Sequence, residues 1–279
     1  MFEPVKDAFR AAGRGDSALL ARRLEEGVPA DSVGSRGDSL LIVAVHNCHA
    51  ACAKVLLDGG ANPNGVKNDG EPLWRACYRD DNAECIREIL THGADPDCSQ
   101  DSASEYTPLM HLAAESNRLS NMAELLRHAP NLDARNDEDE SPLSYACAWG
   151  NFDAVKILLD AGAPINARVC RGETALLVAT GAHNETTNAI IELLLDRGAD
   201  PNIAGTAGSP LVPYWLPLMS YIPSQGADAK NLPTFRRLAA LTRDLNYKMP
   251  DGTTAMTFAR KLGYSPFVDV LRELGASGD

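Results

Sequence analysis

Short apolar segments of similar length recur along the chain, and each is followed by a glycine and a group of turn-forming residues. The same order is found at four places: Leu56–Leu57 before Gly60, Ile89–Leu90 before Gly93, Val155–Leu159 before Gly162, and Ile191–Leu195 before Gly198. Such segments form the apolar stripe of a helix, and the glycine supplies the left-handed residue at which a helix ends. The pattern therefore predicts a series of short amphipathic helices.

A second motif precedes these helices, and its best copy is Ser141–Cys147, which is followed by Gly150 and Asn151. Proline in the first turn of a helix loses no hydrogen bond and has a φ angle suited to the helix. Small residues at Ala44, Ala76 and Ala146 let two antiparallel helices approach closely. Each copy of the motif therefore predicts the first helix of a helix-turn-helix pair.

The motif returns at a nearly constant period. Its apolar residue is Leu41, Leu73, Leu109, Leu143, Leu176, Leu211 and finally Met256, with gaps of 32, 36, 34, 33, 35 and 45 residues. A period of ~33 with this opening motif resembles the ankyrin repeat. The resemblance implies an all-α ankyrin-repeat solenoid of about seven to eight helix-turn-helix units with β-hairpin fingers, capped at both ends.

On this basis we expect one ankyrin-repeat domain over residues 1–279. Its parts are an N-terminal cap unit (1–33), repeats (34–202), an irregular Pro-rich repeat (203–247) and a C-terminal cap repeat (248–279). Residues 4–26 predict two helices, with Val5, Phe9, Leu19, Leu20 and Leu24 facing inward. The last helix is predicted at Pro266–Leu274, and a polar outer face at each end keeps an open stack soluble.

The repeat at 203–247 departs from the pattern. Ser209–Leu211 begins a unit, but Pro213, Pro217 and Pro223 interrupt its first helix, and its second helix is predicted at Leu232–Leu245. Two interpretations stay open. The irregularity is either sequence drift near the C-terminal cap or an insertion that shapes a binding surface.

Composition narrows the class of partner. The net charge is −12, with 44% hydrophobic and 23% charged residues, which describes a folded protein and argues against nucleic acid or an anionic membrane as the partner. Residues 101–200 carry 16 acidic and 7 basic residues, whereas residues 201–279 carry 6 and 8. The acidic middle favours a partner protein with a basic surface, and a role in solubility explains it equally well.

The seven cysteines are scattered and contain no Cys-x-x-Cys pair, which indicates reduced thiols in a cytoplasmic protein. No basic run followed by an apolar stretch opens the chain, so we expect no signal peptide. The stretch most like a metal site is His46–Cys52, where Cys48 and Cys52 are four residues apart. The resemblance explains this stretch without a metal, because Cys48 takes the position of the turn glycine and His49 that of the histidine that commonly follows. We expect no metal and no cofactor.

No phosphate loop, nucleophile elbow, metalloprotease helix or cysteine–histidine pair is found, so we do not expect an enzyme. The resemblance implies a protein–protein interaction module that is a monomer on its own. Two alternatives stay open: an immunity-type inhibitor of a toxin or enzyme, and a bacterial effector directed at a host protein. A toxin gene next to this one would identify the inhibitor.

The resemblance also implies where a partner binds, because ankyrin repeats use a concave face built from the fingers and the first helices. The positions of this sequence that match are Arg75, Tyr78, Arg79, His111, Glu115, Tyr145 and Trp149, together with the acidic finger Asp137, Glu138, Asp139 and Glu140. Tyrosine, tryptophan and arginine dominate the energetics of protein interfaces. We therefore predict these residues as the partner-binding surface.

Overall fold

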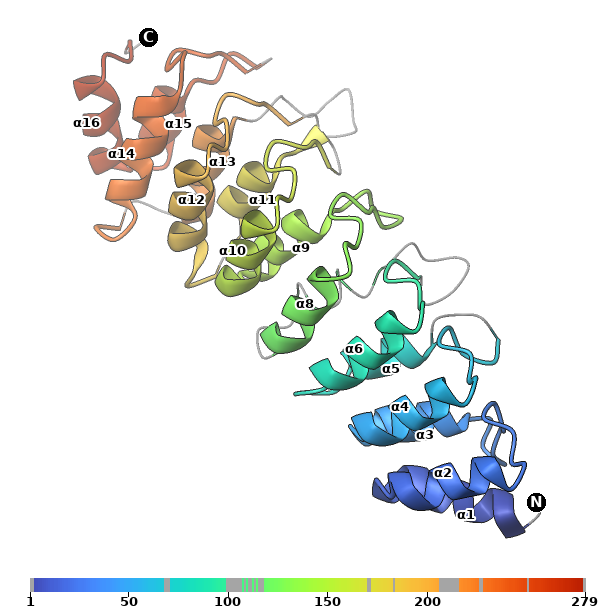
Figure 1. Cartoon of the computed structure of the whole chain (residues 1–279). Coiled ribbons are helices and arrows are strands. Elements are labelled where there is room, and N and C mark those ends of the chain that lie inside the picture. The colour runs from blue at the N-terminus through green and yellow to red at the C-terminus, as the bar shows by residue number, and fades with distance from the viewer. Residues whose placement is uncertain are drawn as a thin grey trace. The chain divides into compact units, whose positions relative to one another are not determined.

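The computed structural model describes residues 3–67, 71–98, 107, 109, 112, 114, 118–169, 172–182, 184–205, 216–225, 228–249 and 251–277. The chain divides into two compact units, Met1–Asp137 and Glu138–Asp279. Within each unit, short α-helices form antiparallel pairs that stack on one another (Figure 1). The two units are described separately below.

The first unit begins with three helix pairs. They are α1 (Glu3–Arg14) with α2 (Ser17–Glu25), α3 (Leu40–His46) with α4 (Ala50–Asp58), and α5 (Glu71–Cys77) with α6 (Ala83–Thr91), and α8 (Leu119–Leu126) follows them. The first helices α1, α3 and α5 pack in one row, and α2, α4, α6 and α8 pack in a second row. The two helices predicted within residues 4–26 are thus present, whereas their role as a cap stays a prediction.

The second unit repeats this arrangement. Its pairs are α9 (Pro142–Trp149) with α10 (Phe152–Asp160), α11 (Ala175–Gly181) with α12 (Thr187–Asp196), α13 (Pro217–Gln225) with α14 (Leu232–Leu241), and α15 (Ala255–Lys261) with α16 (Ser265–Glu273). Again the first helices pack in one row and the second helices in another. The predicted helix-turn-helix units are therefore present in both parts of the chain.

Ser and Thr side chains cap the N-termini of several of the first helices. The side chain of Ser39 accepts a hydrogen bond from the Ile42 N–H, and Thr174 accepts one from the Leu177 N–H. Ser141 and Ser144 form a reciprocal capping box at the start of α9. Each bond satisfies a backbone N–H that has no partner within the helix. In these three repeats the Ser or Thr residue two positions before the motif leucine therefore fixes where the helix begins.

The turn between the two helices of a pair needs a left-handed residue. After α9 this residue is Gly150, with a φ of 72°, and after α3 it is Cys48, with a φ of 59°. Glycine adopts this conformation without steric cost, whereas other residues adopt it rarely. The structure thus confirms that Cys48 takes the position of the turn glycine.

The core lies between the rows and between successive pairs. Ala44, Ala76 and Ala146 are fully buried, as expected of small residues where two helices approach closely. On the second helices, Leu56 and Ile89 are also fully buried, each on the face that meets the neighbouring helix. Burial of one such side chain contributes about 1.5–3 kcal/mol. The predicted role of the apolar pairs is therefore confirmed.

Two elements differ in detail from the prediction. The buried face of α1 consists of Ala8, Ala11 and Ala12, whereas Val5 and Phe9 are only half-buried, because small side chains bring α1 close to its neighbours. Helix α14 ends at Leu241, before the predicted Leu245, since Thr242 has extended backbone angles. The motif Ser209–Leu211 lies outside the described residues, and the described first helix of that repeat begins at Pro217.

Fingers connect one pair to the next. Val33 and Ser39 form an antiparallel β-bridge, and the Gly34 N–H donates to the Asp38 carbonyl across the same turn at 2.8 Å. In a later finger the Val169 N–H donates to the Glu173 carbonyl at 2.7 Å. Within the described residues these contacts are single bridges and not extended strands. The fingers therefore hold short hairpins only.

A series of Asn and Asp side chains joins each turn to the next along the stack. In each of these bonds a side-chain oxygen accepts from a backbone N–H. With the acceptor first, the pairs in the first unit are Asp31 and Asn62, Asn64 and Asp95, and Asp97 and Asn131. Those in the second unit are Asn166 and Asp200, Asn202 and Arg243, and Asn246 and Ser277. The distances lie between 2.7 and 2.9 Å. Pro164 stands at the position of Asn131 and Asp200, and proline has no N–H to donate. The Asx residues after each helix-ending glycine therefore have a structural role.

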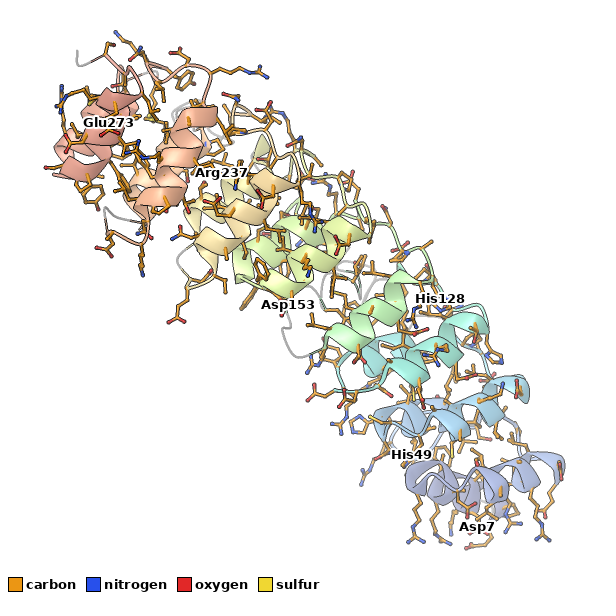
Figure 2. The ribbon with its side chains drawn as sticks, turned by 60° about the vertical axis from the view of Figure 1, so that its left-hand side comes forward. Asp7, His49, His128, Asp153, Arg237 and Glu273 are labelled. Carbon is orange, nitrogen blue, oxygen red and sulfur yellow. The ribbon has the colours of Figure 1, made fainter. Side chains whose placement is uncertain are left out.

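The second helices of the second unit are also tied by ion pairs and rings. Arg237 on α14 pairs with Glu192 and Asp196 on α12, and Arg236 pairs with Glu273 on α16 at 2.7 Å (Figure 2 labels Arg237 and Glu273). Beneath them, the rings of Phe235 and Phe267 stack with centroids 3.8 Å apart. Aromatic stacking and charge pairs thus hold α12, α14 and α16 in register.

A carboxylate in the first unit lies among basic side chains. Glu124 on α8 is 4% exposed at its side chain and accepts two hydrogen bonds from Arg87 at 3.1 Å and one from Arg127 at 2.6 Å. His128 Nε2 lies 3.7 Å away. Hydrogen bonding by Arg87 lowers the pKa of Glu124 below its ordinary value. The charged form of Glu124 therefore stabilises the contact between α6 and α8.

We expect Glu124→Gln to lower the free energy of unfolding by ~1–3 kcal/mol at pH 7, because the buried carboxylate loses its charge-assisted bonds. A lowered folded-state pKa stabilises the fold above the ordinary carboxyl pKa, and this stabilisation is lost as the pH falls. The difference between wild type and variant should therefore shrink toward pH 3. Urea denaturation across this range measures it. Glu84→Gln, which changes an exposed carboxylate on α6, should have little effect, and a pH-independent deficit in Glu124→Gln would contradict the assignment.

The six described cysteines are in no disulfide, and their side chains differ in exposure to solvent. Cys48 is exposed and Cys98 is half-buried, whereas Cys52, Cys77, Cys85 and Cys147 are buried. Burial raises the pKa of Cys52 to about 11 and that of Cys85 to about 12. Cys170 lies outside the described residues. Because the thiolate is the reactive form, the buried thiols are protected both by access and by protonation.

Alkylation of the native chain at pH 7.5 should therefore modify Cys48 first, and Cys52, Cys77, Cys85 and Cys147 should react only after unfolding. Peptide mass spectrometry of a time course with iodoacetamide measures the order. Early modification of Cys77 or Cys147 would show that the stack opens locally around these residues.

Candidate partner-binding surface

In the first unit, the predicted residues lie on α5 and in the turn after it. Arg75 is exposed and pairs with Glu71 one turn earlier at 3.1 Å. Tyr78 is 42% exposed, and its ring lies 5.9 Å from that of buried Trp74. Arg79 is exposed as well. The structure therefore places these three residues at the C-terminal end of α5 and in the turn after it, and their part in binding stays a prediction.

Buried amides fix the turn that carries Arg79. The backbone N–H of Asn82 donates to Asn121 Oδ1 at 3.0 Å, and its side-chain amide donates to the Val45 carbonyl at 3.1 Å. Asn121 in turn donates to the Arg79 carbonyl at 2.7 Å. Residues of α3 and α8 thereby bond to the turn between α5 and α6. The backbone beneath Arg79 is consequently held rigidly.

His111 and Glu115, which were predicted between these residues and Tyr145, lie outside the described residues. The first unit also contains a feature that sequence reasoning did not find. A hollow of about 280 Å³ opens between α1, the first finger and α3, with Phe9 and Val43 at its base and Arg36 at its rim. Gly34 borders it so closely that a Cβ atom there would lie 3.2 Å from the Phe9 ring. Only the three-dimensional approach of the finger to α1 creates this hollow.

In the second unit, Tyr145 and Trp149 lie one turn apart on α9. Trp149 is 63% exposed, the largest exposed fraction among the large apolar side chains described, and Tyr145 is half-buried. Their ring centroids are 6.1 Å apart at an interplanar angle of 49°. The Trp149 indole, at the last turn of α9, is therefore exposed to solvent, and the Tyr145 ring lies beside it.

The acidic finger precedes α9 directly. Glu138 and Asp139 are exposed and Glu140 is half-buried, while Asp137 is the exposed last residue of the first unit. Asp139 has a φ of 59°, which places it at the tip of the finger. The prediction of a solvated acidic finger tip is confirmed, whereas its part in binding stays a prediction.

A connection that sequence reasoning missed lies next to Trp149. Two residues separate α9 from α10, but five residues, Ala182–Thr186, separate α11 from α12. Thr186 Oγ1 lies 2.6 Å from the Gly150 carbonyl, so this longer connection contacts the residue that follows Trp149. The signal that could have revealed it is the extra length before Thr187 in an otherwise regular repeat.

The stretch considered for a metal is used in packing. Cys52 Sγ lies 4.0 Å from the Ala11 carbonyl, and His49 Nε2 lies 3.3 Å from the Gly13 carbonyl. Among the residues that the structure describes, no cluster of three or more His, Cys, Asp or Glu side chains is arranged to hold a metal ion. In the same set of residues, none of the helices has the length and apolar character needed to cross a membrane.

Comparison with known proteins gives one family. The family described as "Ankyrin repeats (3 copies)" matches residues 8–100, 73–169 and 110–205, which together span more than half of the chain. The ankyrin repeat and KH domain-containing protein mask-1 of Caenorhabditis elegans is 29% identical over 204 residues, which are 71% of this chain and 7% of that protein. The mouse ankyrin repeat and SOCS box protein 16 is 30% identical over 195 residues, or 68% and 42% of the two chains.

The chain thus spans less than half the length of either curated relative. Among solved structures, the human ASB11 ankyrin repeat domain is similar over 97% of this chain and 98% of its own, with a TM-score of 0.56 and 24% identity. At this identity the likeness concerns the fold alone.

Proposed function

The chain belongs to the ankyrin-repeat family, and on that premise we propose that it binds a partner protein through the surface around Tyr145 and Trp149. Ankyrin repeats are general protein–protein interaction modules, and the fold is generally a non-enzymatic binding scaffold. The observation that carries the proposal is the exposure of the Trp149 indole, at 63%, on a helix whose opposite face is buried.

The contacts of Trp149 support a role in binding. Its ring contact is with Tyr145 of the same helix. By contrast, Leu143 and Ala146 of α9 are buried in the contacts that α9 makes with α10 and α11. Because the stack is held by the buried face, the indole is available to a partner at no cost to folding.

The energetic argument follows from the size of the ring. Covering ~100 Å² of apolar indole surface at about 25 cal/mol per Å² contributes ~2.5 kcal/mol. Tryptophan and tyrosine also lose little conformational entropy when a partner covers them, and they are enriched at interface hot spots. A surface of this kind serves a scaffold, an inhibitor or an effector equally, and the identity of the partner distinguishes these roles.

The acidic finger favours a basic partner. Asp137–Glu140 precede α9, and the net charge of the chain is −12. Carboxylates on an exposed finger steer encounter more than they add to affinity, because their attraction is screened within about 8–10 Å at physiological ionic strength. We therefore propose that the finger raises the rate of association and that the aromatic pair, Tyr145 and Trp149, provides most of the affinity.

Trp149→Ala should weaken binding of the native partner, isolated by affinity pull-down from the source lysate, at least about tenfold. The melting temperature should move by less than about 2 °C, since the indole is a surface group. Calorimetric titration and thermal unfolding measure the two quantities. Leu262→Ala is the matched control, because Leu262 takes the same position after the motif residue of the last repeat and is 39% exposed.

Two results would overturn the proposal. Unfolding of Trp149→Ala would place the indole in the core. Unchanged affinity and stability would place the partner elsewhere, and the irregular repeat at 203–247 would then be the next surface to test.

Neutralising the finger, with Asn at 137 and 139 and Gln at 138 and 140, should slow association at low salt by several-fold and leave dissociation unchanged. Asparagine is chosen because residue 139 has a left-handed backbone, which Asn tolerates. Stopped-flow association at ~20 mM and ~500 mM salt measures the effect, which should fade at high salt. A slower rate that persists at high salt would mean that the finger makes short-range contacts.

A further inference from the structure

The connection between α11 and α12 lies against Gly150, the residue that follows Trp149. Thr186 Oγ1 lies 2.6 Å from the Gly150 carbonyl, and Asn184 Oδ1 accepts a hydrogen bond from Thr187 at 3.0 Å. A Cβ atom on Gly150 would lie only 2.5 Å from Asn184 Cγ. The absence of a side chain at Gly150 therefore allows this connection to approach the end of α9.

This approach places an exposed acidic residue in the segment that lies against the end of α9. Glu185 stands between Asn184 and Thr186, the two residues that lie against Gly150, and Trp149 directly precedes Gly150. Glu185 is exposed, as is Asp153 in the first turn of α10. Across the described part of the chain, the ion pairs found involve neither of these carboxylates. Two exposed acidic residues thus belong to the segments that follow Trp149 in the chain or lie against the residue after it.

An arginine side chain fits these surroundings better than other groups. Its planar guanidinium stacks on an aromatic face and at the same time donates hydrogen bonds to a carboxylate at its edge. A partner carboxylate would be repelled by Glu185 and Asp153, and a neutral apolar side chain would leave both charges without a counterpart. Charge complementarity therefore selects a cationic, planar group.

We propose that Trp149 and Glu185 form a receptor for an arginine side chain of the partner, with the guanidinium stacked on the indole and paired with the Glu185 carboxylate. This inference rests on the proposed function and specifies the chemistry of the group that docks there. It also gives the longer α11–α12 connection a role, because a two-residue turn like that after α9 contains no residue at the position of Glu185.

The test uses the full chain and two synthetic peptides, acetyl-Gly-Ser-Arg-Ser-Gly-amide and its counterpart with citrulline, which has nearly the same shape without the charge. Backbone amide resonances of Ala148 and Gly150 report binding by NMR titration at low ionic strength. We expect a saturable shift with the arginine peptide that the citrulline peptide does not produce. Trp149→Ala should remove the shift, in keeping with a cation stacked on the ring.

Glu185→Gln should weaken binding of the arginine peptide about threefold, as expected for loss of an exposed ion pair. Glu25→Gln is the matched control: it removes the same charge from an exposed site on α2 of the first unit, and it should leave binding unchanged. Equal binding of both peptides, binding of neither, or equal effects of Glu185→Gln and Glu25→Gln would each overturn the proposal.

These outcomes are distinguishable from failure of the proposed function. If the arginine peptide fails but Trp149→Ala still weakens the native partner, the docking surface stands and only its preference for arginine is lost. If the peptide binds as described but Trp149→Ala leaves the native partner unaffected, the arginine receptor stands and the partner docks elsewhere.

Discussion

A single helix pair of this chain cannot bury its own apolar surface, and the rest of the structure depends on this constraint. Within each unit, successive pairs pack face to face, so Leu56, Ile89 and Leu158 are fully buried on second helices that each contact a neighbouring second helix. The residues at these positions must be apolar and of suitable size. Positions that face neither neighbour are free of this requirement.

The residues that we propose for binding lie at positions that face neither neighbouring pair. On α9, Leu143, Ala146 and Cys147 are buried in the stack, whereas Tyr145 and Trp149 occupy the remaining face. The same separation is the reason we expect the fold to tolerate replacement of Trp149, since the contacts that hold α9 belong to different side chains.

Periodicity and turn chemistry made the helix pairs predictable. Glycines, capping hydroxyls and apolar pairs each act over a few residues, so their consequences can be read locally; even Cys48 at a glycine position was recognised from its register. Features that need two distant segments were not predictable. Phe9 seemed a core residue, but it lies half-buried beside Gly34 of the first finger. Likewise, nothing near Glu185 in the sequence indicates that Gly150 lies against the residues on either side of it.

The hydrogen bonds of the Asn and Asp residues explain where a repeat can gain length. Five of these bonds join residues 31 to 34 positions apart, which fixes the spacing of the turns at one end of the helices. Residues added between the first and second helix of a pair, as Ala182–Thr186 are, extend from the other end and leave these bonds in place. Trp149 is at that same end, at the last residue of α9. An insertion there changes the chemistry around the indole while every buried contact of the stack is kept. Length gained at this end of the helices therefore lies beside the surface that we propose for binding.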